Sequence, residues 1–440
     1  MSIQAQSSRS ADLYKRALGV LPGGVSRNTV LRSPHPLYAD FGDGCRITDL
    51  DGVTRIDFSN NMASLIHGHA CPEITAAVTD QLSRGSAFMM ATESEVQYAE
   101  HLCSRNNGFE KIRFVNSGTE ALMVTLKAAR AFTGRPKVAK VEGAYHGGYD
   151  YAEVSQSPKP DNWGNIDHPE SVPLVHGTPA SALQDVVIIP FNDPDRAIAI
   201  LDKHRDDLAC VLLDLMPHRV GLTPADPSFV SAIRDWTTKN GALLVLDEVI
   251  TFRSKFGGLQ ERYDITPDLS AIGKLIGGGF PVGAVAGRSD IMDVLNPQSA
   301  KLLFPHSGTF SANPVSMIAG KTAMEKFDRV AVDRLNGLAE RAMRGIEHEI
   351  GRTGVRACVT GCGSMFRVHM KPTPPKDFRE AFLTESENKR LLTLLDHLFD
   401  QGFVMINTCS ATLSTPMIEE DIDALVTAMG QGFEVINSMP

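Results

Sequence analysis

The chain carries the stretch ALLVLDEV at residues 242–249 and the stretch SAIGKLIGGG at residues 270–279, and the first of them decides the fold. It is a continuous apolar run that ends in two carboxylates, a pattern typical of a strand buried on both faces of a parallel sheet. Similar short runs alternate with helical periods, at residues 137–141, 186–190, 209–213 and 282–286. This alternation predicts an α/β fold in which helices cover a mainly parallel central sheet.

The remaining segments predict a second, smaller α/β domain built from both termini. Residues 1–65 are expected to hold an N-terminal segment and part of this small domain, residues 66–320 the large cofactor-binding domain, and residues 321–440 the rest of the small domain. In the C-terminal part we expect a long helical stretch over 316–350, strands at 364–370 and 403–407, and helices at 386–401 and from 419 onward. The connection 154–184 has no clear period and is long enough to act as a lid.

Composition excludes several classes of function. The formal net charge of −9 argues against a nucleic-acid partner, because phosphate binding usually requires a basic surplus. The chain has no apolar run long enough to span a membrane and no apolar core of a secretory signal at its start, so we expect a cytoplasmic protein with no membrane partner. The seven cysteines are scattered, which predicts reduced thiols, and the close pair Cys358 and Cys362 is predicted to be two small packed side chains rather than a metal site.

Lys274 and Asp247 together indicate the chemistry. Lys274 follows Gly273 and precedes a triple glycine, so its amine can come close to a planar cofactor and form a Schiff base with it. Asp247 ends a predicted buried strand, where its carboxylate can keep a pyridine nitrogen protonated. The pair predicts a pyridoxal 5'-phosphate (PLP) enzyme in which Lys274 and Asp247 are the catalytic residues. A nucleotide-binding phosphate loop is the weaker interpretation, because Leu275 stands where a magnesium-binding hydroxyl is required.

Three further motifs can hold such a cofactor. The stretch NSGTE at residues 116–120 opens a helix, so its free amides and the hydroxyls of Ser117 and Thr119 can cradle a phosphate, although a plain helix cap is the alternative. Tyr145 lies between two glycines and can stack on a flat ring, or it can simply pack at a strand end. Thr309 lies in a polar loop, where its hydroxyl can reach the same phosphate or serve only an ordinary turn.

In combination these motifs resemble the class III, or subgroup II, PLP-dependent aminotransferases of fold type I. The resemblance runs from about residue 21 to the C-terminus. It is carried by LPGG at 21–24, NSGTE at 116–120, YHG at 145–147, DEV at 247–249, the lysine with its glycines at 273–279, and GTF at 308–310. Within the family the chain is most similar to the group of glutamate-1-semialdehyde aminomutases and β-amino acid transaminases.

The resemblance implies roles for individual residues. Lys274 is similar to the lysine that forms the imine with the cofactor, Asp247 to the partner of the pyridine nitrogen, and Thr309 to a residue lent across a homodimer interface to the neighbouring phosphate. Two shared active sites per homodimer follow. The cofactor-binding residues that it implies are Ser117, Gly118, Thr119, Tyr145, His146, Asp247, Val249, Lys274 and Thr309.

Substrate recognition is where the chain departs from its relatives. The resemblance places Arg32 where an arginine grips a substrate carboxylate, with Arg27 as the competing candidate and a solvated surface arginine as the alternative for both. Residues 407–412 contain neither the basic residue expected of a β-amino acid transaminase nor an acidic one. His218 and Arg219 can supply replacement polar contacts or remain solvated loop residues.

The predicted function is transfer of an amino group from an amine or an ω- or β-amino acid to a carbonyl acceptor, by a ping-pong mechanism through pyridoxamine phosphate. The alternative is an intramolecular aminomutase that shifts an amino group within one molecule. Demand for an external amino acceptor distinguishes the two.

Overall fold

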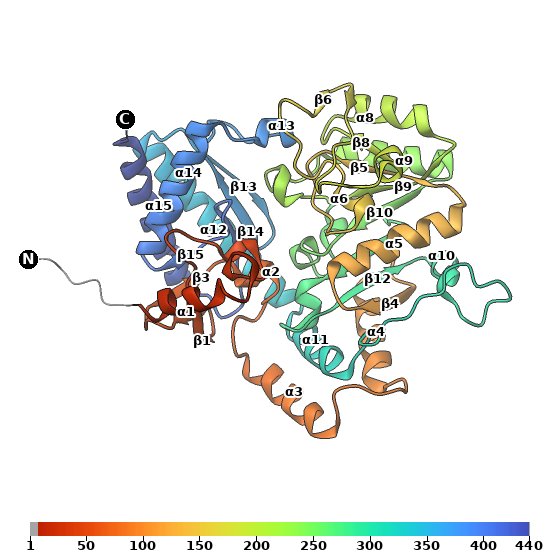
Figure 1. The fold of residues 1–440 in the computed structure, drawn as a ribbon, viewed down its shortest axis with the longest axis horizontal. Coiled ribbons are helices and arrows are strands. Elements are labelled where there is room, and N and C mark those ends of the chain that lie inside the picture. The colour runs from red at the N-terminus through yellow and green to blue at the C-terminus, as the bar shows by residue number, and fades with distance from the viewer. Residues whose placement is uncertain (1–7, 440) are drawn as a thin grey trace, which may run out of the picture.

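A seven-stranded sheet forms the centre of the larger part of the computed structural model, which describes residues 8–439 (Figure 1). In spatial order its strands are β4 (Lys111–Val115), β12 (Gly283–Gly287), β11 (Leu269–Gly273), β10 (Leu243–Asp247), β9 (Leu208–Leu213), β5 (Lys137–Val141) and β8 (Val186–Ile189). β12 is antiparallel to both of its neighbours, and every other pairing in the sheet is parallel. The predicted mainly parallel sheet is confirmed.

Helices cover both faces of this sheet because its strands are apolar on both sides. In β10, Leu244 and Leu246 belong to one buried cluster, whereas Leu243 and Val245 point into another. The first cluster is closed by helices α8 (Pro194–Leu201) and α9 (Pro227–Asn240), and the second by α5 (Gly118–Thr133). Alternation along a strand thus fills two separate layers of the core.

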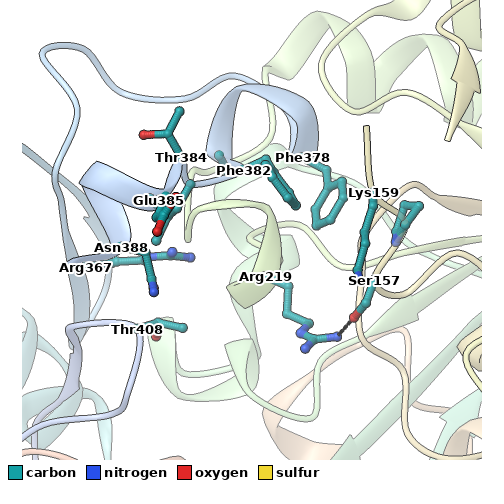
Figure 2. Close-up of a pocket in the computed structure, with 13 residues that line it drawn as sticks. Ser157, Lys159, Arg219, Arg367, Phe378, Phe382, Thr384, Glu385, Asn388 and Thr408 are labelled. Carbon is teal, nitrogen blue, oxygen red and sulfur yellow. Dashed lines mark hydrogen bonds between the residues drawn. The ribbon is translucent and has the colours of Figure 1, made fainter. Parts of the chain in front are cut away.

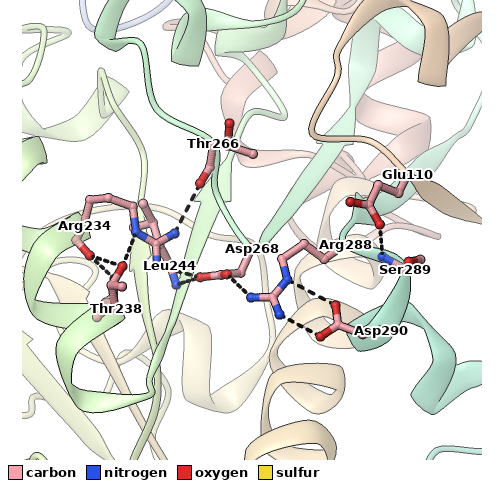
Figure 3. A network of polar contacts seen from close by, with 10 residues as sticks. Glu110, Arg234, Thr238, Leu244, Thr266, Asp268, Arg288, Ser289 and Asp290 are labelled. Atoms are coloured by element: carbon pink, nitrogen blue, oxygen red, sulfur yellow. Dashed lines mark hydrogen bonds and ion pairs between the residues drawn. The ribbon is translucent and has the colours of Figure 1, made fainter.

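A polar network at the start of β11 fixes the register of β10 and β11 (Figure 3). The carboxylate of Asp268 accepts the amide of Leu244 at 2.8 Å and pairs with Arg288 at 2.7 Å and Arg234 at 3.0 Å. Because Asp268 is buried, these contacts offset the cost of removing its charge from water. They lie at the end of the strands opposite to Asp247.

The smaller part of the molecule combines elements from both ends of the chain (Figure 1). One sheet consists of β1 (Ala39–Asp43), β2 (Arg46–Asp49), β3 (Thr54–Asp57) and β15 (Phe403–Val404), and the parallel pairing of β3 with β15 joins the N- and C-terminal segments. A second sheet consists of β13 (Cys358–Cys362), β14 (Met365–His369) and β16 (Ser410–Thr412). Helices α12 (Arg329–Thr353), α14 (Glu385–Asp400) and α15 (Glu419–Asn437) pack around them.

Several predicted elements differ from the observed ones. The long helical stretch is two helices, α11 (Pro314–Lys326) and α12, because Phe327 leaves helical geometry to enter the core and Asp328 caps the next helix. The last predicted strand shortens to β15. Cys358 and Cys362 lie half-buried on β13, and within residues 8–439 no group of His, Cys, Asp and Glu side chains could hold a metal ion.

The connection 154–184 contains the small hairpin of β6 (Gly164–Asn165) and β7 (His168–Pro169) and ends in α7 (Ala180–Gln184). The other helices are α1 (Arg9–Ala17), α2 (Asn60–Ala63), α3 (Pro72–Arg84), α4 (Glu93–Arg105), α6 (Asp150–Glu153), α10 (Ser289–Met292) and α13 (Phe378–Ala381). None of the helices in residues 8–439 combines the length and apolarity needed to cross a bilayer. The cytoplasmic location stays a prediction.

Candidate active site

A cavity of about 160 Å³ lies at the carboxyl ends of the central parallel strands. It is lined by every cofactor-binding residue predicted from the sequence except Thr309: Ser117, Gly118, Thr119, Tyr145, His146, Asp247, Val249 and Lys274. It also contains four residues for which no such role was predicted: Leu122, Gly147, Asp214 and Ile250. Open α/β sheets bind ligands at this edge because the loops after several parallel strands converge there.

Lys274 directly follows β11 and begins a short 3₁₀ turn over Lys274–Gly277. Its φ of 51° lies in the left-handed region, which is costly for a residue with a side chain and is found mostly at functional sites. Burial lowers the pKa of Lys274, while the carboxylates of Asp247 and Asp214 act in the opposite direction. A lowered pKa increases the fraction of neutral amine, which is the form that reacts as a nucleophile or accepts a proton.

Asp247 is held by two hydrogen bonds at the end of β10. One oxygen accepts the amide of Val249 at 3.0 Å, and the other accepts Nδ1 of His146 at 2.7 Å. His146 is buried, and burial lowers its pKa. Because Nδ1 donates to Asp247, Nε2 of the neutral ring is an acceptor. Nε2 is buried and has no hydrogen-bond partner within residues 8–439. The arrangement fixes the direction of the Asp247 carboxylate.

Asp214 is a second carboxyl group in the cavity, and its role was not predicted from the sequence. It follows β9, the strand beside β10, and its side chain accepts the amide of Met216 at 2.9 Å. Burial and the negative charge of Asp247 raise its pKa well above the ordinary value. The raised pKa favours the protonated form of this carboxyl group relative to a solvated aspartate. Its position at the end of a buried strand, which resembles that of Asp247 on β10, is the signal that could have identified it.

The start of α5 forms the cradle predicted for a phosphate. Ser117 caps the helix by accepting the amide of Glu120 at 3.1 Å, so both predicted roles of this serine are compatible, since its hydroxyl hydrogen stays available. The amides of Gly118 and Thr119 belong to the first turn and have no acceptor within the helix. A Cβ at Gly118 would lie 2.8 Å from Val249, so only glycine leaves this approach open.

Tyr145 and Thr309 differ in their relation to the cavity. Tyr145 lines it and is 49% exposed, so its side chain is accessible to a ligand. Thr309 lies on an exposed turn and does not line the cavity of its own chain. This position suits a residue that acts on a neighbouring subunit, which stays a proposal.

Comparison with known proteins identifies the family. The family model for class-III aminotransferases matches residues 30–428. The chain belongs to the class-III aminotransferases. It is similar to an ω-transaminase from Sphaerobacter thermophilus, with 44% identity, a TM-score of 0.95 and 99% of both chains covered. A transaminase solved with PLP bound is 40% identical, with a TM-score of 0.90 and coverage of 98% of this chain and 99% of that one. Glutamate-1-semialdehyde 2,1-aminomutase from Methanothermobacter thermautotrophicus is 36% identical and covers 85% of this chain and 86% of its own.

The cofactor of this class-III aminotransferase is PLP, and the cavity has the groups that PLP requires. The first turn of α5 offers amides to a phosphate, Asp247 offers a carboxylate to a ring nitrogen, and Lys274 offers an amine of lowered pKa to an aldehyde. Gly147 makes room beside Thr119, because a Cβ there would lie 2.5 Å from the Thr119 hydroxyl.

The two arginines expected near the substrate have different surroundings. Arg32 stacks on the ring of Phe399 at 3.6 Å and pairs with Asp396 at 2.8 Å, so α14 already occupies its guanidinium. Arg27 is exposed and donates to the side-chain oxygen of Asn61 at 2.6 Å. Neither arginine lines the cavity. A substrate-binding role for Arg32 therefore stays a prediction, and Arg27 is the less engaged of the two arginines.

The loop 407–412 carries no charged side chain and contacts the ring of His218 through Thr408. Thr408 Oγ1 lies 3.1 Å from Nε2 of His218 and 2.9 Å from the hydroxyl of Ser410. Burial, followed by the positive charges of Arg367, Lys274 and Arg219, lowers the pKa of His218 to about 3. His218 is therefore a neutral hydrogen-bonding group at physiological pH.

Proposed function

We propose that this protein is an aminotransferase that moves an amino group from an amine or an ω- or β-amino acid to a carbonyl acceptor by a ping-pong mechanism. The observation that carries the proposal is the placement of Lys274 in one cavity with Asp247 and the free helix start at Ser117–Thr119. These groups supply an amine, a carboxylate and a phosphate cradle, which together hold PLP and act on its substrates.

PLP, when bound, supplies an aldehyde that takes up the amino group and a ring that withdraws electrons from the reacting carbon. Lys274 Nζ is the group that takes a proton from the amine-bearing carbon of the donor and returns it at the next step, since its lowered pKa makes the neutral amine accessible. Asp247 holds a proton at the ring nitrogen, and His146 Nδ1 keeps that carboxylate in place. Asp214 lies in the same cavity, and its raised pKa favours the neutral form beside the Asp247 carboxylate.

For substrates with a carboxylate close to the amine, we propose Arg27 as the binding residue, with Arg32 positioning the segment that carries it. Support comes from the Arg32 contacts with Asp396 and Phe399, which leave Arg27 as the exposed guanidinium. A guanidinium fork matches a carboxylate in both charge and geometry.

We also propose a homodimer with Thr309 reaching the partner's phosphate. Exposed apolar side chains support this assembly: Phe310 beside Thr309 is 59% exposed, and Phe88, Met89 and Met90 are exposed as well. Consecutive exposed apolar side chains, such as those of residues 88–90, are typical of an interface.

An absorbance experiment tests the function. The purified protein should show the visible band of a Schiff base between PLP and a lysine, and an amine donor should bleach it while an added carbonyl acceptor restores it. Replacing Lys274 with Ala should abolish turnover and leave PLP affinity measurable. A Lys274→Ala variant that transaminates at the parental rate would refute the proposal.

The intramolecular aminomutase is the second candidate, favoured by the similarity to glutamate-1-semialdehyde 2,1-aminomutases. The loop 407–412 carries no acidic residue, which is the reason we place the aminotransferase first. A mutase converts its substrate without any external acceptor, whereas an aminotransferase stops after one half-reaction until an acceptor is added.

A further inference from the structure

A second cavity, of about 450 Å³, lies between the large part of the molecule and the small domain (Figure 2). Its walls come from the segment 157–159 at the start of the long connection, from α13 and the start of α14, and from β14. Arg219 lines this cavity and lies near Tyr145, which lines the cofactor pocket.

Arg367 is the most informative residue of this second cavity. It lies on β14, is only 5% exposed, and points toward the cavity in Figure 2. Its Nη1 donates to the backbone oxygen of His218 at 3.0 Å, and its buried Nε has no hydrogen-bond partner in the described range 8–439. Among residues 8–439 no carboxylate forms an ion pair with it; burial lowers its pKa to about 10, so it stays charged. A buried charge without an opposite charge is costly, and an anionic ligand would remove that cost.

The other lining residues indicate the chemical nature of the rest of such a ligand. Arg219 donates to the hydroxyl of Ser157 at 2.5 Å and to the backbone oxygen of Gln156 at 3.1 Å, which holds a second guanidinium in the cavity. Phe378 and Phe382 form an apolar wall. Glu385 is the acidic lining residue and is exposed at the first turn of α14. The cavity therefore suits an organic anion whose charge is carried on an apolar chain.

His218 connects Arg367 to the reacting centre. Its backbone oxygen accepts from Arg367, its ring contacts Thr408 of the same cavity, and the charges of both Arg367 and Lys274 act on the ring. His218 thus lies between the guanidinium of Arg367 and the surroundings of the Lys274 amine.

We propose that Arg367, supported by Arg219, binds the distal carboxylate of an ω-amino acid donor whose apolar chain lies against Phe378 and Phe382. This inference rests on the proposed aminotransferase function and assigns the donor class. It also accounts for the uncharged loop 407–412, because the charge that binds the carboxylate comes from β14 instead.

The test compares matched ligands on the holoenzyme. Calorimetry with hexanoate and with the neutral 1-hexanol measures the preference for a carboxylate at equal chain length. Arg367→Gln and Arg219→Gln should each weaken hexanoate binding by roughly 10- to 100-fold and leave 1-hexanol unchanged, the range for one lost hydrogen bond between charged groups. Arg344→Gln, on an α12 side chain that is 70% exposed, is the control and should bind as the parent does.

Kinetics supplies the second readout. KM for 6-aminohexanoate should rise by a similar factor in both variants, whereas KM for hexylamine should not change. If Arg367→Gln fails to fold, Arg219→Gln alone decides, and an unchanged preference for hexanoate overturns the inference. If amine donors bleach the Schiff-base band but 6-aminohexanoate is not preferred over hexylamine, only the carboxylate subsite is refuted. If hexanoate binds through Arg367 but no donor bleaches the Schiff-base band, the aminotransferase proposal is refuted. The anion-binding role of Arg367 then still holds.

Discussion

Gly147 offers a sharp test of the geometry of the cofactor cradle. Its φ is 86°, and an added Cβ would lie 2.5 Å from Oγ1 and 2.9 Å from Cα of Thr119. The left-handed conformation costs an alanine about 1–2 kcal/mol, and the overlap adds about 1–3 kcal/mol unless Thr119 moves. Gly148 is the matched control, because a Cβ there meets nothing within 4 Å.

We expect Gly147→Ala to displace Thr119 and so remove one or two hydrogen bonds to the PLP phosphate. A hydrogen bond to a charged group is worth about 1.5–3 kcal/mol, which corresponds to a rise of roughly 10- to 100-fold in the Kd for PLP. Titration of the apoenzyme with PLP, followed by absorbance, gives this Kd, and urea unfolding should show Gly147→Ala to be less stable than Gly148→Ala. Equal PLP affinity in the two variants would refute the role assigned to this contact.

Three further predictions follow from the site and its surroundings. Asp247→Asn should lower kcat by at least about 10- to 100-fold in steady-state assays, because the ring nitrogen loses a charged partner, and an unchanged kcat would exclude that role. Arg27→Gln should raise KM for 3-aminobutanoate by roughly tenfold or more and leave KM for 1-phenylethylamine unchanged. Arg32→Gln should instead lower thermal stability. If Arg32→Gln raises KM for 3-aminobutanoate and Arg27→Gln does not, Arg32 is the binding residue. Lys140 is buried, donating to Ala144 and Val154, and burial lowers its pKa from 10.5 to about 7. Between pH 7 and 10.5 the unfolded chain therefore binds a proton at this lysine that the folded chain lacks, so Lys140 makes the unfolding free energy rise with pH by up to about 1.4 kcal/mol per pH unit. Lys140→Met should flatten this rise when the unfolding free energy is measured in urea at pH 7 and 9.5. An equal rise in the parent and the variant would contradict the prediction.

The strands of the central sheet and the residues at their ends were predictable because their signals are local. A buried strand needs only a short apolar run, and Asp247 and Lys274 lie at or directly after such runs. The direction of a strand is not local, so the antiparallel course of β12 could not be obtained in this way. The break at Phe327 was missed for a similar reason, since tertiary packing draws this side chain into the core between two helix-forming segments.

The substrate side of the site depended on contacts between distant parts of the chain. Arg32, which is predicted to bind substrate, pairs with Asp396 at a separation of 364 positions, and sequence spacing gives no sign of such a pairing. Arg367 carried no sequence signal at all, because its burial without an acidic partner results from the packing of β14 against the segment of His218. Asp214 was recognisable in principle, since it repeats the strand-end position of Asp247 on the neighbouring strand.

The central claim is that Lys274 Nζ forms the covalent bond to PLP. Borohydride treatment of the PLP-loaded protein reduces such a bond irreversibly, and peptide mass spectrometry then locates the adduct. We predict the reduced pyridoxyl group on Lys274 and its loss from that peptide in Lys274→Ala. An adduct on another lysine, or no adduct in fully loaded protein, would contradict the account.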